Sequence, residues 1–223
     1  MKKHIVCYGD SNTWGCIPRW KDSLLPSERY DEETRWPCVM ASELGAGYHV
    51  IEEGLGGRTT IYDDTQELYK RGIDYLLPCL LTHRPLDLVI IMLGTNDMKH
   101  RFNLLPVDIA NGAAELGKLV ERYDYGPEYP VPKVLLVCPI ELGEGIENSI
   151  FTGFSSDAVS VSRQLPPFYE KHAANHNWLY FNAASVAQPS KKDMLHMEKE
   201  DHLALAAALE TVIRNHFGKE PNG

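Results

Sequence analysis

Short apolar segments alternate along the chain with longer segments whose apolar residues recur every three or four positions. The short segments predict β-strands, and the periodic segments predict helices between them. The third predicted strand reads LVIIML and is apolar at every position, which is typical of a parallel strand covered on both faces. The five predicted strands are His4–Tyr8, Tyr48–Glu52, Leu88–Leu93, Val134–Cys138 and Trp178–Phe181.

Proline positions constrain the predicted helices. Pro78 lies inside one of them and predicts a kink or a late start, whereas Pro106 suits a first turn. A helix before the last strand is placed only over Phe168–Asn175, because Pro166 and Pro167 are excluded from a helix interior. The last helix has one apolar stripe formed by Leu205, Leu209, Val212, Ile213 and Phe217. Together with Phe168–Asn175, the predicted helices are Trp36–Leu44, Gly72–Thr82, Val107–Arg122 and the last helix, Glu198–Phe217.

Strands that alternate with helices predict an α/β fold with one doubly wound parallel sheet. The chain has 223 residues, without repeats or a linker, and a domain commonly has about 150. We therefore expect a single domain over residues 1–223. In such sheets ligands bind beyond the carboxyl ends of the strands, so the segments that follow the strands are the candidate site.

Four of these segments carry polar or glycine residues. GDSN (9–12), GLGGRTT (54–60) and GTND (94–97) follow the first three strands, and DMLH (193–196) precedes the last helix. A serine is a weak nucleophile unless a base removes its proton, and a histidine does this near neutral pH. A carboxylate on the other ring nitrogen fixes the tautomer. The spacing lets Asp193 reach His196, so Ser11, His196 and Asp193 are candidates for nucleophile, base and orienting acid.

A tetrahedral intermediate also needs hydrogen-bond donors aimed at its oxyanion. Candidate donors are the backbone N–H of Ser11, the backbone N–H of Gly57 and the side-chain amide of Asn96. Glycine allows the backbone to approach a substrate closely. The sequence leaves open whether Gly56 or Gly57 supplies the second donor.

The four blocks, in this order, resemble the SGNH hydrolases, also called the GDSL esterase and lipase family. Ser11, Gly57 and Asn96 match its serine, glycine and asparagine, and Asp193 with His196 matches its last block. The longer segments RWPCVMASELGA, VIEEGLGGRTT and PLDLVIIMLGTND are similar to the arylesterase and acetyl-transfer branch. The resemblance extends over about residues 4 to 217.

This resemblance implies a flavodoxin-like three-layer α/β/α fold with a five-stranded parallel sheet and a shallow site without a mobile lid. It implies a serine esterase that hydrolyses short-chain, acetyl-like esters through an acyl-enzyme, with acyl transfer to alcohols as a variant and without metal or cofactor. Trp14 would line the acyl pocket, while Asp10 and Asp97 would brace the structure. The excursion Ile17–Thr34 would shape the site, and its frequent part in oligomer contacts leaves a homo-oligomer open. The family usually has a glycine at the position of Met194. The larger methionine side chain is expected to narrow the site.

Several other interpretations compete with this one. Ser11 alone is compatible with a turn or a helix cap, and a non-catalytic carbohydrate- or partner-binding module on the same fold is the alternative to an enzyme. His202 follows Asp201 directly, but neighbours on a helix do not face each other, so we expect it to be structural. His172 and His176 have a zinc-like spacing without the glutamate of a zinc protease.

The acidic pairs Glu52-Glu53 and Asp63-Asp64 resemble the two carboxylates of a glycosidase only superficially. Adjacent residues on a strand point to opposite faces, so a solvated or salt-bridged role is expected instead, with Arg58 as a candidate bridging partner. Tyr62 and the loop Pro139–Asp157 are candidates to border the pocket.

Composition removes other classes of function. The formal net charge is −9 and the pI is about 5.5, which argues against nucleic acid or an anionic membrane as partner. No apolar run reaches the roughly 20 residues of a membrane span, and the apolar N-terminal stretch is too short for a signal peptide. We expect a small-molecule ester as the substrate. Five scattered cysteines indicate a reducing, cytoplasmic compartment without a disulfide framework. These cysteines are Cys7, Cys16, Cys38, Cys79 and Cys138.

Overall fold

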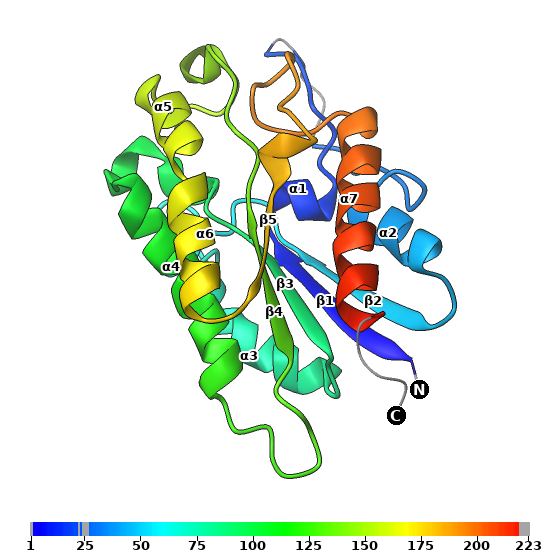
Figure 1. Cartoon of the computed structure of the whole chain (residues 1–223). Coiled ribbons are helices and arrows are strands. Elements are labelled where there is room, and N and C mark those ends of the chain that lie inside the picture. The colour runs from blue at the N-terminus through cyan, green and yellow to red at the C-terminus, as the bar shows by residue number, and fades with distance from the viewer. Residues whose placement is uncertain (1, 22, 24–26, 219–223) are drawn as a thin grey trace.

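Five parallel strands form one sheet in the order β2-β1-β3-β4-β5 in the computed structural model, which describes residues 2–21, 23 and 27–218 (Figure 1). This is the flavodoxin-like order, so the predicted fold class is confirmed. All five residues of β3 are buried, as its uniformly apolar sequence predicts. The strands are β1 (Lys3–Gly9), β2 (Tyr48–Gly54), β3 (Leu88–Met92), β4 (Lys133–Cys138) and β5 (Leu179–Asn182).

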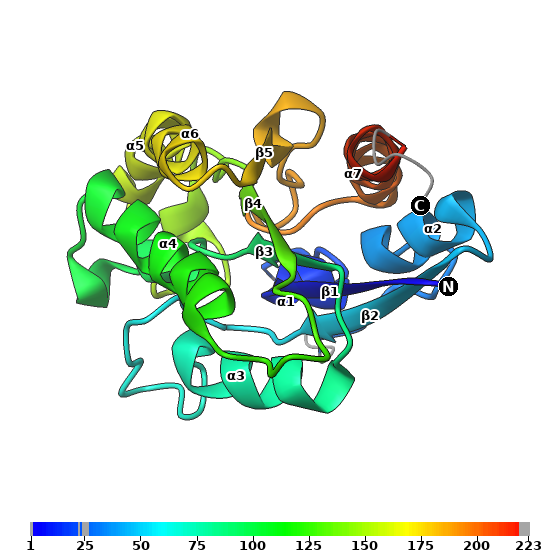
Figure 2. The same cartoon turned by 60° about the horizontal axis from the view of Figure 1, so that its bottom comes forward.

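Helices cover both faces of the sheet and produce three layers (Figure 2). One face packs against α2 (Trp36–Leu44) and α7 (Lys199–Phe217). The other packs against α3 (Gly72–His83), α4 (Pro106–Arg122) and α6 (Pro166–Asn175). Shorter helices are α1 (Ser11–Trp14), α5 (Asp157–Gln164) and 3₁₀ turns at Asn96–Met98, His100–Phe102, Ile146–Asn148 and Ala183–Ser185. None of the helices in the described ranges is both long and apolar enough to cross a bilayer.

The structure adds to the predicted helices at four places. Helix α3 continues through Pro78, and α6 begins with Pro166 and Pro167 in its first turn, where a missing N–H costs least. Helix α5 was not predicted, because Pro166 and Pro167 made a helix before the last strand hard to place on their N-terminal side; α5 ends at Gln164, before both prolines. The GDSN segment leads into one turn of helix, which begins at Ser11. Part of the excursion Ile17–Thr34 lies outside the described residues.

Side chains of β1 alternate between the two apolar layers, because successive residues of a strand point to opposite faces. Val6 and Tyr8 join the layer under α3, α4 and α6, whereas Ile5 and Cys7 join the layer under α2 and α7. His202 is fully buried in α7, and its Nδ1 lies 3.4 Å from the backbone nitrogen of Trp36. Burial lowers the pKa of His202 to about 4, so the ring is neutral and has a structural position.

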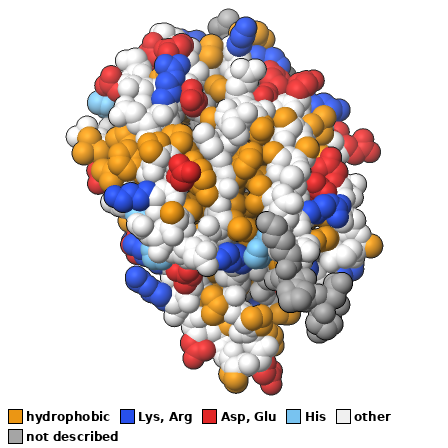
Figure 3. All heavy atoms as spheres, viewed as in Figure 1, with side chains coloured by type: hydrophobic (Ala, Val, Ile, Leu, Met, Phe, Trp, Pro, Cys, Tyr) orange, Lys and Arg blue, Asp and Glu red, His pale blue; other side chains and the backbone are white. Residues whose placement is uncertain are grey.

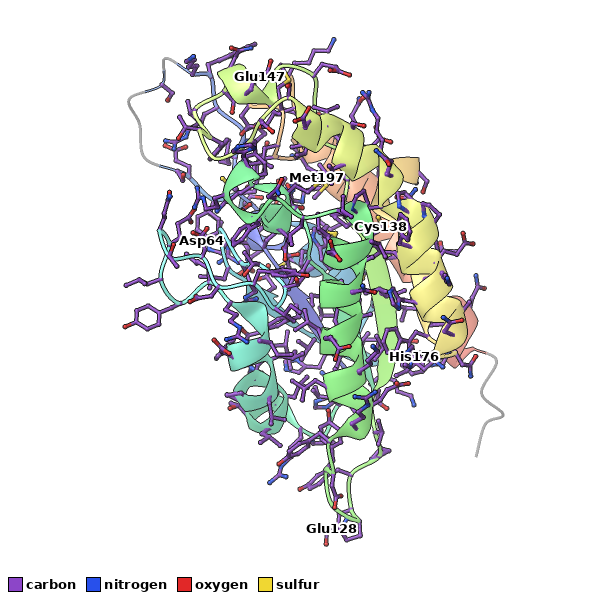
Figure 4. The ribbon with its side chains drawn as sticks, turned by 90° about the vertical axis from the view of Figure 1, so that its left-hand side faces the viewer. Asp64, Glu128, Cys138, Glu147, His176 and Met197 are labelled. Atoms are coloured by element: carbon purple, nitrogen blue, oxygen red, sulfur yellow. The ribbon has the colours of Figure 1, made fainter. Side chains whose placement is uncertain are left out.

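The carboxyl ends of β1, β2 and β3 meet because the chain leaves β1 for one side of the sheet and returns to β3 on its other side. This switch point is where open α/β sheets place their ligands. Figure 4 shows Glu147, in the loop after β4, and Met197, beside DMLH, towards one end of the molecule, with Glu128 at the opposite end. The segments that carry the candidate chemistry therefore share one edge.

Gly54 at the end of β2 lies directly against the backbone of α1. A Cβ on Gly54 would lie 2.2 Å from the nitrogen of Trp14 and 2.6 Å from its Cα, so a side chain must push α1 away. We expect Gly54→Ala to lower the free energy of unfolding by about 1–3 kcal/mol, measured by chemical denaturation. Gly47→Ala is the matched control, because a Cβ there meets nothing within 4 Å. Equal stability of the two variants would contradict this close packing.

Candidate active site

Ser11, His196 and Asp193 form a continuous chain of hydrogen bonds. The Oγ of Ser11 lies 2.9 Å from Nε2 of His196, and Nδ1 of His196 lies 2.8 Å from Oδ2 of Asp193. The other carboxylate oxygen of Asp193 accepts the backbone N–H groups of Leu195 and His196 at 3.1 and 2.9 Å. The arrangement places a proton acceptor against a hydroxyl and a carboxylate behind that acceptor, which is the geometry of an activated serine.

The turn of helix at α1 holds Ser11 at the edge of the sheet. Asp10 caps this helix, and its Oδ1 accepts the backbone N–H of Asn12 at 3.0 Å. Gly15 ends the helix in a left-handed conformation, with φ of 87°. Asp10 thus has the contact expected of a residue that braces the turn.

The side chain of Asn12 clamps the segment that carries His196. Its Oδ1 accepts the backbone N–H of Met197 at 3.0 Å, and its Nδ2 donates to the carbonyl of Leu195 at 3.2 Å. The two bonds lie on either side of His196 and fix its backbone relative to Ser11. The sequence did not predict this contact, because no local pattern links Asn12 to residues that follow it by 183 and 185 positions.

The candidate oxyanion donors line one cavity with Ser11 and His196. Leu55 to Arg58 form a turn closed by a 3.0 Å bond from the Arg58 N–H to the Leu55 carbonyl, with φ of 80° at Gly57. Across the described part of the chain, the N–H groups of Ser11, Gly56 and Gly57 have no acceptor. Asn96 donates one amide hydrogen to the Arg58 carbonyl at 3.2 Å, which leaves its second hydrogen available.

Asp97 ties the segment after β3 to the segment after β2. Its two carboxylate oxygens lie 3.0 and 3.1 Å from the backbone nitrogen of Thr60, and the Thr60 hydroxyl donates to it as well. Burial raises the pKa of Asp97 to about 6, although the bonds from Thr60 act in the opposite direction. Asp97 does not contact Ser11 or His196, so it lies where a brace would.

Arg58 does not bridge the acidic pairs, contrary to the expectation from the sequence. It is buried beneath the turn and donates to the carbonyls of Gly9, at 2.9 Å, and Glu53, while its guanidinium lies 4.1 Å from the ring centre of Tyr8. The acidic side chains have other partners. Glu52 pairs with Arg35 at 2.8 Å, Glu53 with His83 at 2.9 Å, and Asp64 with Arg101 at 2.8 Å.

The cavity at Ser11 has a volume of about 510 Å³ and two chemically different sides. Basic and acidic groups form one side: Lys99 pairs with Glu67, whose carboxylate also lies beside Gly57. Phe151 brings its ring centre to 5.2 Å from that of His196. Tyr62, a candidate to border this cavity, instead bonds through its hydroxyl to the carbonyl of Asp108 at 3.0 Å. The apolar side is formed by Trp14, Leu55, Phe151, Phe154 and Leu195.

Met194 does not narrow this cavity, contrary to expectation. It adopts φ of 62°, a left-handed conformation that glycine takes readily and that explains the usual glycine at this position. Its side chain lines a different cavity, together with Leu142 and Pro189, and its sulfur lies over Gly143. The substitution therefore changes the surface behind the turn and leaves the space at Ser11 unchanged.

The environment of His196 favours its protonated form. Burial lowers the pKa of His196, but the hydrogen bond to Asp193 and the neighbouring Cys16 thiol outweigh that effect and raise it to about 9. Cys16 is a buried free thiol on the cavity wall, and all five cysteines are free. An imidazole of raised pKa is a stronger base once it is neutral.

The two histidines with zinc-like spacing do not converge on each other. His172 pairs with Asn111 at 2.9 Å, and His176 pairs with Glu121 at 3.1 Å and stacks on Trp178. Figure 4 shows His176 well away from Asp64, which lies in the loop between β2 and α3. The two histidines therefore take separate partners near the surface.

A model of the GDSL-like lipase/acylhydrolase family matches residues 7–217. The chain belongs to this family. The M. smegmatis aryl esterase structure is 39% identical over 96% of this chain and 99% of that one, with a TM-score of 0.87. The Sinorhizobium meliloti carbohydrate acetylesterase Est24 is 38% identical over 97% of this chain and 100% of that one, also with a TM-score of 0.87. A comparison with curated protein sequences gives no match.

The family model and these related structures confirm the family predicted from the sequence. They also show that the protein is a carboxylic ester hydrolase. The surface seen in Figure 3 has basic and acidic side chains interspersed, with hydrophobic side chains between them.

Removal of the Asn12 clamp tests how His196 is held. We expect Asn12→Ala to lower the free energy of unfolding by about 1–3 kcal/mol, because it leaves buried backbone groups unpaired. Hydrogen exchange of the Met197 amide should accelerate in the same variant. Asn148→Ala is the control, because Asn148 is exposed and, among the described residues, its side chain bonds to Glu147 alone. An unchanged Met197 exchange rate in Asn12→Ala would contradict the clamp.

Proposed function

We propose that this esterase hydrolyses short-chain, acetyl-like esters with Ser11 as nucleophile, His196 as base and Asp193 as orienting acid. The observation that carries the proposal is the chain of hydrogen bonds from Ser11 through His196 to Asp193, at 2.9 and 2.8 Å. Two consecutive hydrogen bonds of this length require all three side chains to be aligned. A serine that only forms a turn or caps a helix does not require such an alignment.

The reaction follows from this alignment in two steps. The Oγ of Ser11 attacks the acyl carbonyl while its proton passes to Nε2 of His196. The bond between the acyl carbon and the alcohol oxygen then breaks, and His196 returns the proton to the leaving alcohol. Water, activated by the same imidazole, cleaves the acyl-enzyme and releases the acid. Asp193 keeps the ring in one tautomer and stabilises the imidazolium.

The oxyanion of each tetrahedral intermediate is proposed to bind the N–H groups of Ser11 and Gly57 and the amide of Asn96. The free donors described above support this role. Gly57 is preferred to Gly56 because it matches the glycine of the family's second block. The left-handed φ of 80° at Gly57 also gives glycine an advantage at that position.

Restriction to short acyl groups is proposed from the aromatic groups nearest the reacting atoms. Trp14 ends the helix that Ser11 begins, Phe151 lies against His196, and both aromatic side chains line the cavity at Ser11. The relatives named as an aryl esterase and a carbohydrate acetylesterase are consistent with a small acyl group and a larger alcohol. The apolar wall also suits acyl transfer to an alcohol in place of water. A non-catalytic binding module is the alternative.

Replacement of the nucleophile separates these functions. With 4-nitrophenyl acetate, we expect Ser11→Ala to reduce kcat/KM by roughly 10⁴-fold or more, because the rest of the triad cannot act without its nucleophile. Ser27→Ala is the matched control, since Ser27 lines the same cavity and should retain its rate. Equal and negligible turnover by wild type and Ser11→Ala would favour the binding module. Turnover retained in Ser11→Ala would move the nucleophile elsewhere.

The pH dependence tests His196 as the base. Because neutral imidazole accepts the proton, and the pKa of His196 is raised to about 9, kcat/KM should rise about tenfold per pH unit below that value and level off above it. Asp193→Asn removes the carboxylate that holds the pKa up. The inflection should then move to lower pH, and the plateau should fall by several orders of magnitude. An inflection that stays in place in Asp193→Asn would contradict the assignment.

A further inference from the structure

Glu53, Cys79 and His83 form a cluster of potential metal ligands on the sheet face that α3 covers. One donor atom from each residue lies within 4.8 Å of the donor atoms of the other two, and Nε2 of His83 lies 2.9 Å from Oε1 of Glu53. Across residues 2–21, 23 and 27–218, this is the one group of three histidine, cysteine or acidic side chains found so close together. None of the three lines the cavity at Ser11.

The fold brings these residues together from two elements. Cys79 and His83 are four apart on α3, so their side chains lie on one face of the helix, one turn apart. Glu53 is on β2 in register with Tyr8, whose side chain belongs to the apolar layer under α3, so Glu53 points to the same side. Cys79 is fully buried, whereas the side chains of His83 and Glu53 are 28% and 17% exposed. A small ion can therefore reach the cluster from the His83 side.

We propose that Glu53, Cys79 and His83 bind a divalent cation of the zinc class. A thiolate, an imidazole and a carboxylate are the ligand types that zinc takes in proteins, with Zn–S of about 2.3 Å and Zn–N or Zn–O of about 2.0 Å. Tetrahedral geometry would then set the donor atoms about 3.3–3.5 Å apart. The Glu53 and His83 atoms, 2.9 Å apart, would have to separate slightly, and any donor pair as far apart as the 4.8 Å limit of the cluster would have to approach by about 1.3–1.5 Å. A water molecule would complete the coordination.

The charge of the cluster suits a divalent ion. The Cys79 thiolate and the Glu53 carboxylate together balance two positive charges, with the Cys79 proton released to solvent on binding. Arg58 lies near the cluster, but its guanidinium bonds to the carbonyl oxygens of Gly9 and Glu53 and lies over the ring of Tyr8. The carboxylate of Glu53 therefore has His83 as its ion-pair partner among the described residues.

The bound ion would fasten the edge strand β2 to α3. The sequence points to no metal for ester hydrolysis, and this site lies outside that chemistry. A partial signal for it was present in the sequence, because a cysteine and a histidine four positions apart share one face of a helix that includes both. The predicted helix Gly72–Thr82 ends one residue before His83, and the structure extends it to that residue. The effect of the metal should accordingly appear in stability, since an ion that binds only the folded chain stabilises it by mass action.

Cobalt spectroscopy tests the site directly. The full chain is treated with a chelator, exchanged into metal-free buffer and titrated with Co²⁺. One equivalent should produce a thiolate-to-Co²⁺ charge-transfer band in the near ultraviolet, Zn²⁺ should remove that band, and Zn²⁺ should raise the Tm. A wild-type chain without the band overturns the proposal, whatever the behaviour of the variants.

Matched variants assign the ligands. Cys79→Ser should abolish the charge-transfer band, and His83→Gln should weaken Zn²⁺ binding by at least about tenfold. Cys38→Ser and His176→Gln are the controls; His176 pairs with Glu121 at 3.1 Å, much as His83 pairs with Glu53. A band that survives in Cys79→Ser, or one that disappears in Cys38→Ser, overturns the assignment. Because His83 is partly exposed, His83→Gln remains informative if Cys79→Ser does not fold.

Discussion

The hydrogen bond between Ser11 and His196 joins two segments 185 residues apart, and much of the structure serves to let it form. A bond of 2.9 Å tolerates little displacement at either end, so both ends must be fixed to the same body. The sheet supplies that body: Ser11 follows β1, and the close approach of Gly54 to α1 sets where Ser11 lies. Asn12 then bonds on both sides of His196, so the residue next to Ser11 also positions His196.

Buried carboxylates stabilise this edge of the sheet, although a buried charge is costly unless it is fully hydrogen-bonded. Asp193 satisfies the requirement with two backbone N–H groups and His196, and Asp97 does so with Thr60. Asp64, also fully buried, takes Arg101 and Lys99. Each of these acids binds groups from another segment or fixes a tight turn, so the loops at this edge are tied to one another. In the proposed reaction, such ties would hold the donors to the oxyanion in place before the substrate binds.

The strands and most helices could be predicted because their patterns are local in the sequence. The apolar run of β3 and the apolar stripe on α7 indicate which faces are buried. The candidate site was predictable because Ser11, Asn96 and His196 stand in polar blocks beside predicted elements, and chemistry limits what such blocks do. The partners of Arg58 and the clamp by Asn12 were not predictable. They depend on which distant carbonyl or N–H lies within reach, and that follows only from the assembled fold.

Met194 shows which part of the last block determines the geometry. A left-handed φ costs a residue with a side chain roughly 1–2 kcal/mol, yet the turn keeps the conformation that glycine would take. Its N–H bonds to the Ser190 carbonyl at 2.8 Å, and its carbonyl accepts the Gly143 N–H at 2.9 Å. These backbone bonds, with the N–H groups that Asp193 accepts, fix the turn without help from the side chain of residue 194. The position is therefore free to vary in side chain while Asp193 and His196 keep their alignment.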